Sequence, residues 1–200
     1  MASEIDITIT RGKTFEFAFL YAEDDLLYLP ITGMPSKAPC RLTVAGHGIP
    51  DGWPVQVQGC KTPVELNTQD GESLIAKVID ANTIEFNAIN ASAWKALSGP
   101  GVVVLNKPLD LTGWQCRAQV RDRVGGELLF SWHSDPAESP DGKAEVDVAA
   151  CAFVLKLSAE QAAALDFKRG LYDAEAVSPT GEVYPLTAIS QVTVEDEVTA

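Results

Sequence analysis

Apolar and polar residues alternate along most of this chain with the period of two that is typical of β-strands. The isoleucines of residues 5–9 alternate with polar residues, and after the turn at 11–13 the phenylalanines of residues 15–19 do the same. Successive side chains of a strand point to opposite faces of a sheet. We therefore expect a hairpin whose aromatic row lies in a core, with its second strand ended by the acidic run 23–25.

The last third of the chain, Leu155 to Thr199, is expected to combine a short helix with three strands. Ser158 followed by Gln161 is the signature of a helix capping box, and the apolar run 162–165 continues the helix. After Gly170 the period returns to two, which predicts a three-strand meander.

The middle of the chain differs in composition from the parts before and after it. From residue 30 to residue 108 it is rich in Gly and Pro, which interrupt short apolar runs. These runs predict strands at 40–44, 53–57, 73–79, 83–87 and 101–105, with a short helix at 91–97. Several short strands separated by turns favour a small β-barrel of its own.

The strands predicted before and after this middle part share the same alternation of apolar and polar residues, so the middle is interpreted as an insertion. Residues 1–29 and 109–200 are expected to form one β-sandwich, and residues 30–108 an inserted small β-barrel module. Loop tips tolerate such insertions because closing a longer loop costs little additional entropy.

Composition and charge exclude several classes of protein. The chain is 46% hydrophobic and 22% charged, enough apolar content for real cores. No apolar run approaches the roughly 20 residues that span a bilayer, and the first ten residues lack a signal peptide's features, so neither membrane insertion nor export is expected. The formal net charge of −13 disfavours binding to nucleic acid, which requires clustered Lys and Arg.

No catalytic, cofactor-binding or metal-ligating residues are assigned, and the protein is predicted not to be an enzyme. Its cysteines and histidines include no C-x-x-C pair and are widely spaced: Cys40, Cys60, Cys116, Cys151, His47 and His133. This spacing disfavours zinc, and buried thiols are expected. A Cys40–Cys60 disulfide is the alternative, disfavoured in a reducing cytoplasm.

Two other kinds of site, a calcium site and a catalytic pair of carboxylates, are only weakly indicated by the sequence. The acid-rich loop 133–142 lacks the ligand alternation of a calcium-binding EF-hand loop, and is expected to be a solvated loop. A glycosidase-like pair of carboxylates stays open, because the sequence does not give the separation of acidic side chains.

Two features are candidate partner contacts. Trp53 stands in the Gly/Pro-rich segment 51–54, where a turn needs no large aromatic residue, and it is expected to contact another subunit or the rim of its own module. Glu195, Asp196 and Glu197 end an acidic region without Lys or Arg. They are expected on an edge strand, either as solvated charge that blocks aggregation or as a docking surface for a basic neighbour.

The inserted segment resembles the small β-barrel modules of tailed-phage tail proteins. The positions that match this pattern are His47, Gly48, Asp51, Gly52, Leu66, Asn67, Asp80, Asn82 and Thr83. Such modules are similar in fold pattern to the first catalytic cysteine half-domain of ubiquitin-activating enzymes, but the resemblance implies no catalytic role. Trp53 departs from the pattern, which usually has a polar residue there, and this departure suggests an exposed side chain.

The flanking segments resemble Ig-like domains of phage tail and baseplate proteins, including those of the baseplate upper-protein type. The matching positions are Asp110, Leu111, Thr112, Gly113, Trp114, Arg121, Leu155, Leu157, Ser158, Leu165, Gly170, Tyr172, Gly181, Val192 and Thr193. The implied fold is mostly β: an Ig-like β-sandwich interrupted by a small β-barrel module, with one or two short helices.

Together the resemblances imply a non-enzymatic structural component of a tailed-phage virion. It would belong to the tail or baseplate, be assembled in the host cytoplasm, and bridge neighbouring subunits in multiple symmetric copies. A head–tail neck component is one alternative. A carbohydrate-binding module for host attachment is another, and it would require an exposed aromatic platform among Trp53, Trp94, Trp114 and Trp132.

Overall fold

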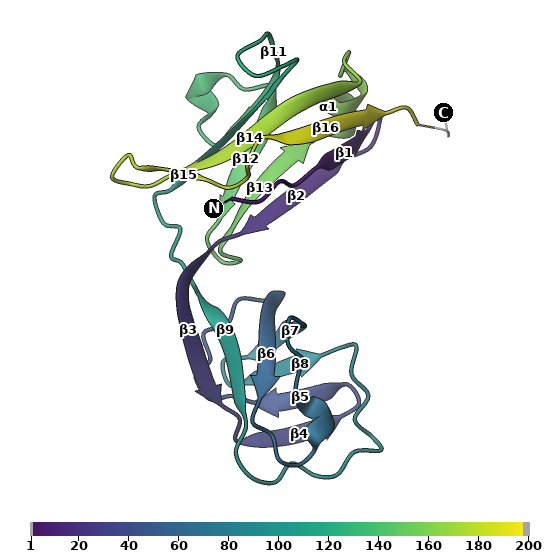
Figure 1. Ribbon diagram of the computed structural model, residues 1–200, viewed down its shortest axis with the longest axis vertical. Coiled ribbons are helices and arrows are strands. Elements are labelled where there is room, and N and C mark those ends of the chain that lie inside the picture. The colour runs from purple at the N-terminus through teal and green to yellow at the C-terminus, as the bar shows by residue number, and fades with distance from the viewer. Residues whose placement is uncertain (1, 198–200) are drawn as a thin grey trace. The chain divides into compact units, whose positions relative to one another are not determined.

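The computed structural model describes residues 2–197, and its chain divides into two compact units (Figure 1). The split unit is formed by Met1–Tyr21 together with Asp110–Ala200, and the inserted unit by Ala22–Leu109. The inserted unit begins earlier than the expected residue 30, because residues 22–30 form a strand that pairs within it.

The split unit is a β-sandwich with short helices. Its strands are β1 (Ile7–Thr10), β2 (Phe15–Leu20), β10 (Gln115–Arg121), β11 (Leu128–His133), β12 (Gly142–Asp147), β13 (Ala152–Leu157), β14 (Arg169–Val177), β15 (Val183–Pro185) and β16 (Ser190–Glu195). Its helices are η2 (Pro136–Glu138), a 3-10 turn, and α1 (Ala159–Ala163). The strand order is β1-β16-β14-β10-β11-β12-β13-β2, with β15 also on β14.

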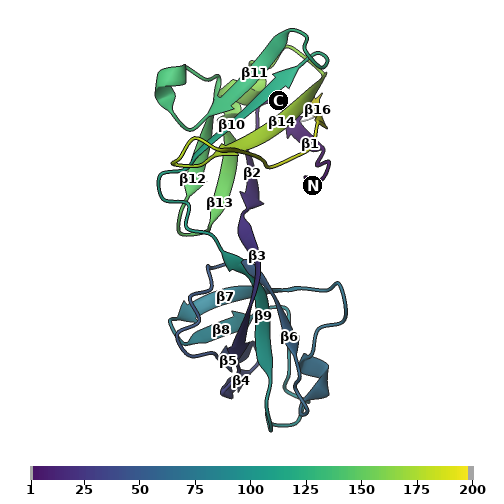
Figure 2. The ribbon, with the colours of Figure 1, turned by 60° about the vertical axis from the view of Figure 1, so that its left-hand side comes forward.

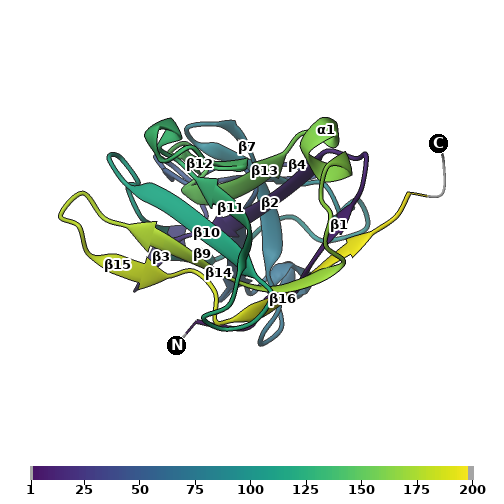
Figure 3. The same ribbon diagram turned by 90° about the horizontal axis from the view of Figure 1, so that it is seen from above.

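This one sheet folds over into two layers, which Figure 3 shows from above. Strands β1, β16, β14, β10 and β11 form one layer, and β12, β13 and β2 the other. The layers join where β11 runs parallel to β12 over only two residue pairs, Trp132↔Gly142 and His133↔Lys143. The inward positions of both layers form the core, whose largest members are Ile9, Trp132, Phe153, Leu155, Leu157 and Tyr172.

The predicted N-terminal hairpin is wrong. β1 pairs in parallel with β16, whereas β2 pairs antiparallel with β13 in the other layer. The turn between them therefore carries the chain across the sandwich. The Arg11 guanidinium fixes this turn by donating to the carbonyl oxygens of Leu165 (2.9 Å) and Phe167 (3.0 Å). Period-two alternation places side chains on a face, but it does not choose the neighbouring strand.

The C-terminal region keeps its predicted capping box but not its meander. The Ser158 hydroxyl accepts from the Gln161 backbone N–H, and the Gln161 side chain accepts from the Ser158 N–H. β15 and β16 both lie along β14 on the side away from β10, so they form one partner strand broken at residues 186–189. The end of the predicted segment, residues 198–199, lies outside the described residues.

The inserted unit is a seven-stranded, barrel-like sheet (Figure 2). Its strands, in the order β3-β9-β6-β7-β8-β5-β4, are β3 (Ala22–Pro30), β9 (Val102–Pro108), β6 (Trp53–Gln58), β7 (Leu74–Asp80), β8 (Thr83–Phe86), β5 (Cys40–Thr43) and β4 (Gly33–Lys37). The five predicted strands are confirmed, whereas β3 and β4 were not predicted from the sequence. Its core is apolar, with Leu42, Trp53, Leu66, Ile84 and Phe86 among its most buried side chains.

Two local predictions for this unit are corrected. The acidic run 23–25 does not end a strand but lies inside β3, where the register with β9 shifts between Ala22 and Leu26. The helix expected at 91–97 is a turn closed by the Trp94 N–H on the Ala91 carbonyl (2.9 Å). The described helix of this unit is instead the 3-10 turn η1 (Val64–Leu66). Across residues 2–197, no helix is both long and apolar enough to span a membrane.

Candidate functional site

Trp53 is not exposed. It opens β6, where it alternates with outward-facing residues, and only 2% of its surface is accessible. Its indole Nε1–H donates to the Asn106 carbonyl at 3.3 Å, which satisfies the one polar group of the ring. The expectation of an exposed Trp53 is wrong, because period-two burial in β6 carries this residue into the core of its own module.

Glu195, Asp196 and Glu197 lie at the end of β16, which is not an edge strand because it sits between β1 and β14. Basic residues also lie beside them. Arg11 donates its backbone N–H to the Glu195 carbonyl at 2.9 Å and pairs through Nη1 with Asp196, and Lys13 Nζ lies 3.7 Å from Glu197 Oε1. The edge position and the absence of neighbouring cations are therefore corrected, while a partner contact through this surface stays a prediction.

The aromatic platform that a carbohydrate-binding module would need is not formed by the four tryptophans. Trp53 and Trp132 are buried, and Trp94 and Trp114 are half-buried. Trp114 instead joins an aromatic cluster in the split unit, where its ring centroid lies 5.6–6.1 Å from those of Tyr184, Tyr21 and Phe153.

The four cysteines are free, buried thiols. Burial raises the pKa of Cys40 to about 11 and that of Cys116 to about 12. Burial also raises the pKa of Cys60, and that of Cys151, for which the nearby carboxylates of Asp110 and Asp147 add to the effect. A thiol is nucleophilic only as the thiolate, so these groups are held in their unreactive form at neutral pH.

Two carboxylates of the acid-rich loop 133–142 bind backbone N–H groups, one in the loop itself and one in the neighbouring strand β11. Asp135 caps η2 by accepting from the Ala137 N–H at 2.8 Å, and Asp141 accepts from the Ser131 N–H at 2.9 Å. In the part of the chain from residue 2 to residue 197, no three acidic, histidine or cysteine side chains gather as metal ligands would.

The polar residues of the barrel pattern fasten turns. His47 Nδ1 accepts from the Ile49 N–H at 3.0 Å, which leaves Nε2 as the donor to the Asp80 carbonyl at 2.8 Å. The Asp51 carboxylate accepts from the Val78 N–H at 2.7 Å. These side chains connect loops to strands of the barrel, which accounts for their presence without a ligand.

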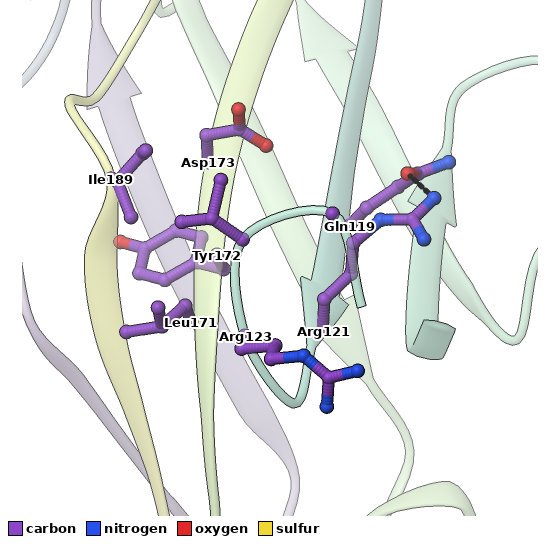
Figure 4. Close-up of a pocket in the computed structure, with 9 residues that line it drawn as sticks. Gln119, Arg121, Arg123, Leu171, Tyr172, Asp173 and Ile189 are labelled. Carbon is purple, nitrogen blue, oxygen red and sulfur yellow. Dashed lines mark hydrogen bonds between the residues drawn. The ribbon is translucent and has the colours of Figure 1, made fainter. Parts of the chain in front are cut away.

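A hollow of about 210 Å³ lies on the outer face of β10 and β14, opposite the sandwich core (Figure 4). We call it the outer hollow and define it by Gln119, Arg121, Arg123, Val124, Leu171 and Ile189, with Asp173 at one side. Figure 4 shows the two guanidinium groups on one side of the hollow, and Leu171 and Ile189 on the other.

Arg121 is the most firmly positioned charge in the outer hollow. Its Nη1 donates to the Gly126 carbonyl at 2.7 Å, and its Nη2 donates to Gln119 Oε1 at 2.9 Å. Both acceptors are neutral, and within residues 2–197 no carboxylate pairs with this guanidinium. The site therefore presents a fixed positive charge, suited to holding an anion.

The outer hollow was not predicted from the sequence. Its residues come from β10, the turn after it, β14 and the break between β15 and β16, and only the fold brings these segments together. The available signal was the run Arg121-Asp122-Arg123-Val124 before Gly125-Gly126, which places two cations and an exposed valine at a hairpin tip.

Comparison of the chain with known protein-family models and with curated proteins found no match.

Proposed function

We propose that this protein is a non-enzymatic building block of a tailed-phage particle, located in the tail or baseplate, where it bridges neighbouring subunits. It would be assembled in the host cytoplasm and incorporated in several symmetric copies. The proposal rests on the two phage resemblances together with the roles that their residues have in the fold.

The observation that carries the proposal is that the motif residues of the inserted unit have structural roles. Asn67 brackets one loop: its amide donates to the Cys60 carbonyl at 2.9 Å, and its Oδ1 accepts from the Cys60 N–H at 2.8 Å. The Asp80 carboxylate accepts from the Asn82 N–H in the turn between β7 and β8, and Asn82 Oδ1 accepts from the Gly46 N–H of another loop. Because these motif residues hold turns and loops of the fold, they favour a scaffold role for the protein over a catalytic one.

The surfaces suited to bridging are the sheet edges. Among residues 2–197, β3 has a strand neighbour, β9, on one side only, and it carries Leu26 and Tyr28 with 49% and 59% of their surfaces exposed. β2 is likewise the last strand of its layer, and Leu20 on it is 47% exposed. Unpaired strand edges with apolar side chains are typical sites at which a neighbour adds a strand.

Deleting the gene from the phage and examining the particles by electron microscopy tests the proposal. We expect heads with absent or incomplete tails or baseplates, restored when the intact gene is supplied in trans. Complete tails that fail to join heads would indicate the neck instead. Normal, infectious particles without the gene would contradict a structural role.

A further inference from the structure

The outer hollow combines a fixed positive charge with exposed aliphatic side chains. We infer that it binds a short acidic segment of another protein, in which a carboxylate meets Arg121 and an adjacent aliphatic side chain meets Val124 and Ile189. The inference concerns this hollow alone, and it stands whether or not the protein is a particle component.

Arg121 supplies the anchor. Two of its N–H groups are occupied by the neutral acceptors Gly126 O and Gln119 Oε1, so the guanidinium is already oriented before a ligand arrives. Its remaining N–H groups are the donors available to an incoming carboxylate, and its planar fork suits that group. Because the side chain is already held, little rotamer freedom is lost on binding.

Arg123 supplies a second, adjustable cation. Its Nη1 lies 2.6 Å from Asp122 Oδ2, but the Arg123 side chain is 77% exposed. An ion pair this exposed is weak, so the guanidinium can turn toward a ligand at small cost. Asp122 itself is held by the turn, because its Oδ1 accepts from the Arg123 and Glu127 backbone N–H groups.

The aliphatic side chains define the other half of the ligand. Val124 is 70% exposed at the tip of the β10–β11 hairpin, and Ile189 is 49% exposed in the break between β15 and β16. Leu171 on β14 is half-buried, lies opposite Arg121 in the β10–β14 register, and lines the same hollow. A ligand that places an aliphatic side chain here removes apolar surface from water on both sides of the contact.

Asp173 limits which ligands fit. It is exposed, lies opposite Gln119 on the neighbouring strand, and lines the same hollow. Its charge repels a second carboxylate and attracts a donor such as a backbone N–H. The charge pattern therefore suits a segment with one carboxylate at the arginine side, rather than a polyanion such as nucleic acid, which a chain of net charge −13 also repels.

The test uses the intact protein and two blocked peptides, acetyl-Thr-Val-Glu-Ile-Thr-amide and the same peptide with Gln in place of Glu. Each is titrated into ¹⁵N-labelled protein and followed by amide chemical shifts. We expect saturable shifts for the Glu peptide at residues 119–126, 171–173 and 189, and binding about tenfold weaker for the Gln peptide. Raising NaCl to about 500 mM should weaken the Glu peptide by several fold.

Variants assign the effect to named side chains. Arg121→Gln should weaken the Glu peptide about tenfold, and Arg123→Gln should weaken it about threefold without touching the turn's hydrogen bonds. Asp173→Asn should tighten it, since a repelling charge is removed. The matched control is Arg117→Gln: Arg117 lies on the same face of β10 but pairs with Glu175 outside the outer hollow, so it should leave the affinity unchanged.

Equal affinities for the Glu and Gln peptides would overturn the inference, as would shifts mapping elsewhere, or no saturable shift up to about 10 mM peptide. If Arg121→Gln does not fold, Arg123→Gln and Asp173→Asn decide: no change in either affinity overturns the inference. Inorganic phosphate that produces the same shifts and displaces the peptide at equal concentration would make the hollow a small-anion site, and the peptide inference would fall.

Discussion

At the scale of single residues, burial changes along the aromatic row of β2. Phe19 is 7% exposed, whereas Phe15 and Phe17 are half-buried. β2 is the last strand of its layer, so within the described part of the chain it has a strand neighbour on one side only. The rings of Phe17 and Phe19 meet edge to face, with centroids 5.0 Å apart. The energetic contribution of the row should therefore be concentrated in Phe19.

Phe19→Ala should lower the free energy of unfolding by about 3–5 kcal/mol, as expected for a buried ring. Phe17→Ala serves as the matched control and should cost about 1–2 kcal/mol, because part of that ring stays in water in the folded state. Urea unfolding of both variants measures the difference. A larger loss for Phe17→Ala than for Phe19→Ala would place the core elsewhere along the strand.

The buried thiols make stability depend on pH. In the folded state the pKa of Cys40 is about 11 and that of Cys116 about 12, raised by burial from an unfolded value near 9.0. The unfolded chain therefore releases these protons first as the pH rises. Above about pH 9 the unfolded state therefore binds fewer protons than the folded state, and the free energy of unfolding must fall as the pH rises further.

We expect the urea midpoint to be constant between about pH 7 and pH 8 and to fall progressively from about pH 9 to pH 12. Replacing Cys40 and Cys116 by Ala should reduce the slope in that window, whatever the variant's stability at neutral pH. A midpoint that stays level or rises over this window would show that these thiols ionise as readily in the folded protein as in the unfolded one.

At the scale of elements, the join between β11 and β12 depends on a glycine. A Cβ atom at Gly142 would lie 2.7 Å from Leu157 Cδ2 and 2.8 Å from the indole of Trp132. That indole is fixed, because its Nε1–H donates to the Lys156 carbonyl at 3.2 Å. A side chain at residue 142 would therefore force Leu157 and Trp132 to shift where the two layers meet.

Gly142→Ala should lower the free energy of unfolding by about 1–3 kcal/mol through overpacking. In a Trp132→Phe background the same change should cost less, because the smaller ring leaves room for the methyl group. Thermal or urea unfolding of the four proteins in this cycle gives the coupling. Equal costs in the two backgrounds would refute the steric explanation.

Period-two alternation predicted most strands of both units, and the Ser158–Gln161 capping box, because these signals are local. Pairing could not be predicted in the same way. β1 and β2 look like a hairpin, yet their partners, β16 and β13, lie more than a hundred residues away. The acidic run 23–25 resembles a strand end, but pairing with β9 continues beyond it through a register shift.

The candidate site was less predictable than the fold. The burial of Trp53 follows from its place in β6, but its Gly/Pro neighbours suggested a turn. The cations beside Asp196 and Glu197 come from residues 11 and 13, at the other end of the chain. Ile189 and Arg121 line the same hollow only because β15 and β16 break beside β14.

At the scale of the whole molecule, the two units should be separable in folding. Replacing Ala22–Leu109 with a short Gly/Ser linker should leave the split unit folded, because its strand pairs and core are internal to it. Circular dichroism and urea unfolding should show one cooperative transition.

The matched variant removes only residues 30–108, leaving most of β3 without its partner β9, and it should be less soluble. Loss of cooperative unfolding in the first variant would contradict the division into units.

We propose that this protein is part of a phage particle, and quantitative mass spectrometry of particles purified by density gradient tests that proposal. A known tail protein serves as the internal reference. We expect the protein to co-purify with the particles at a constant ratio to that reference, a ratio that reflects the symmetry of the tail or baseplate. A protein abundant in infected cells but absent from purified particles would contradict the claim.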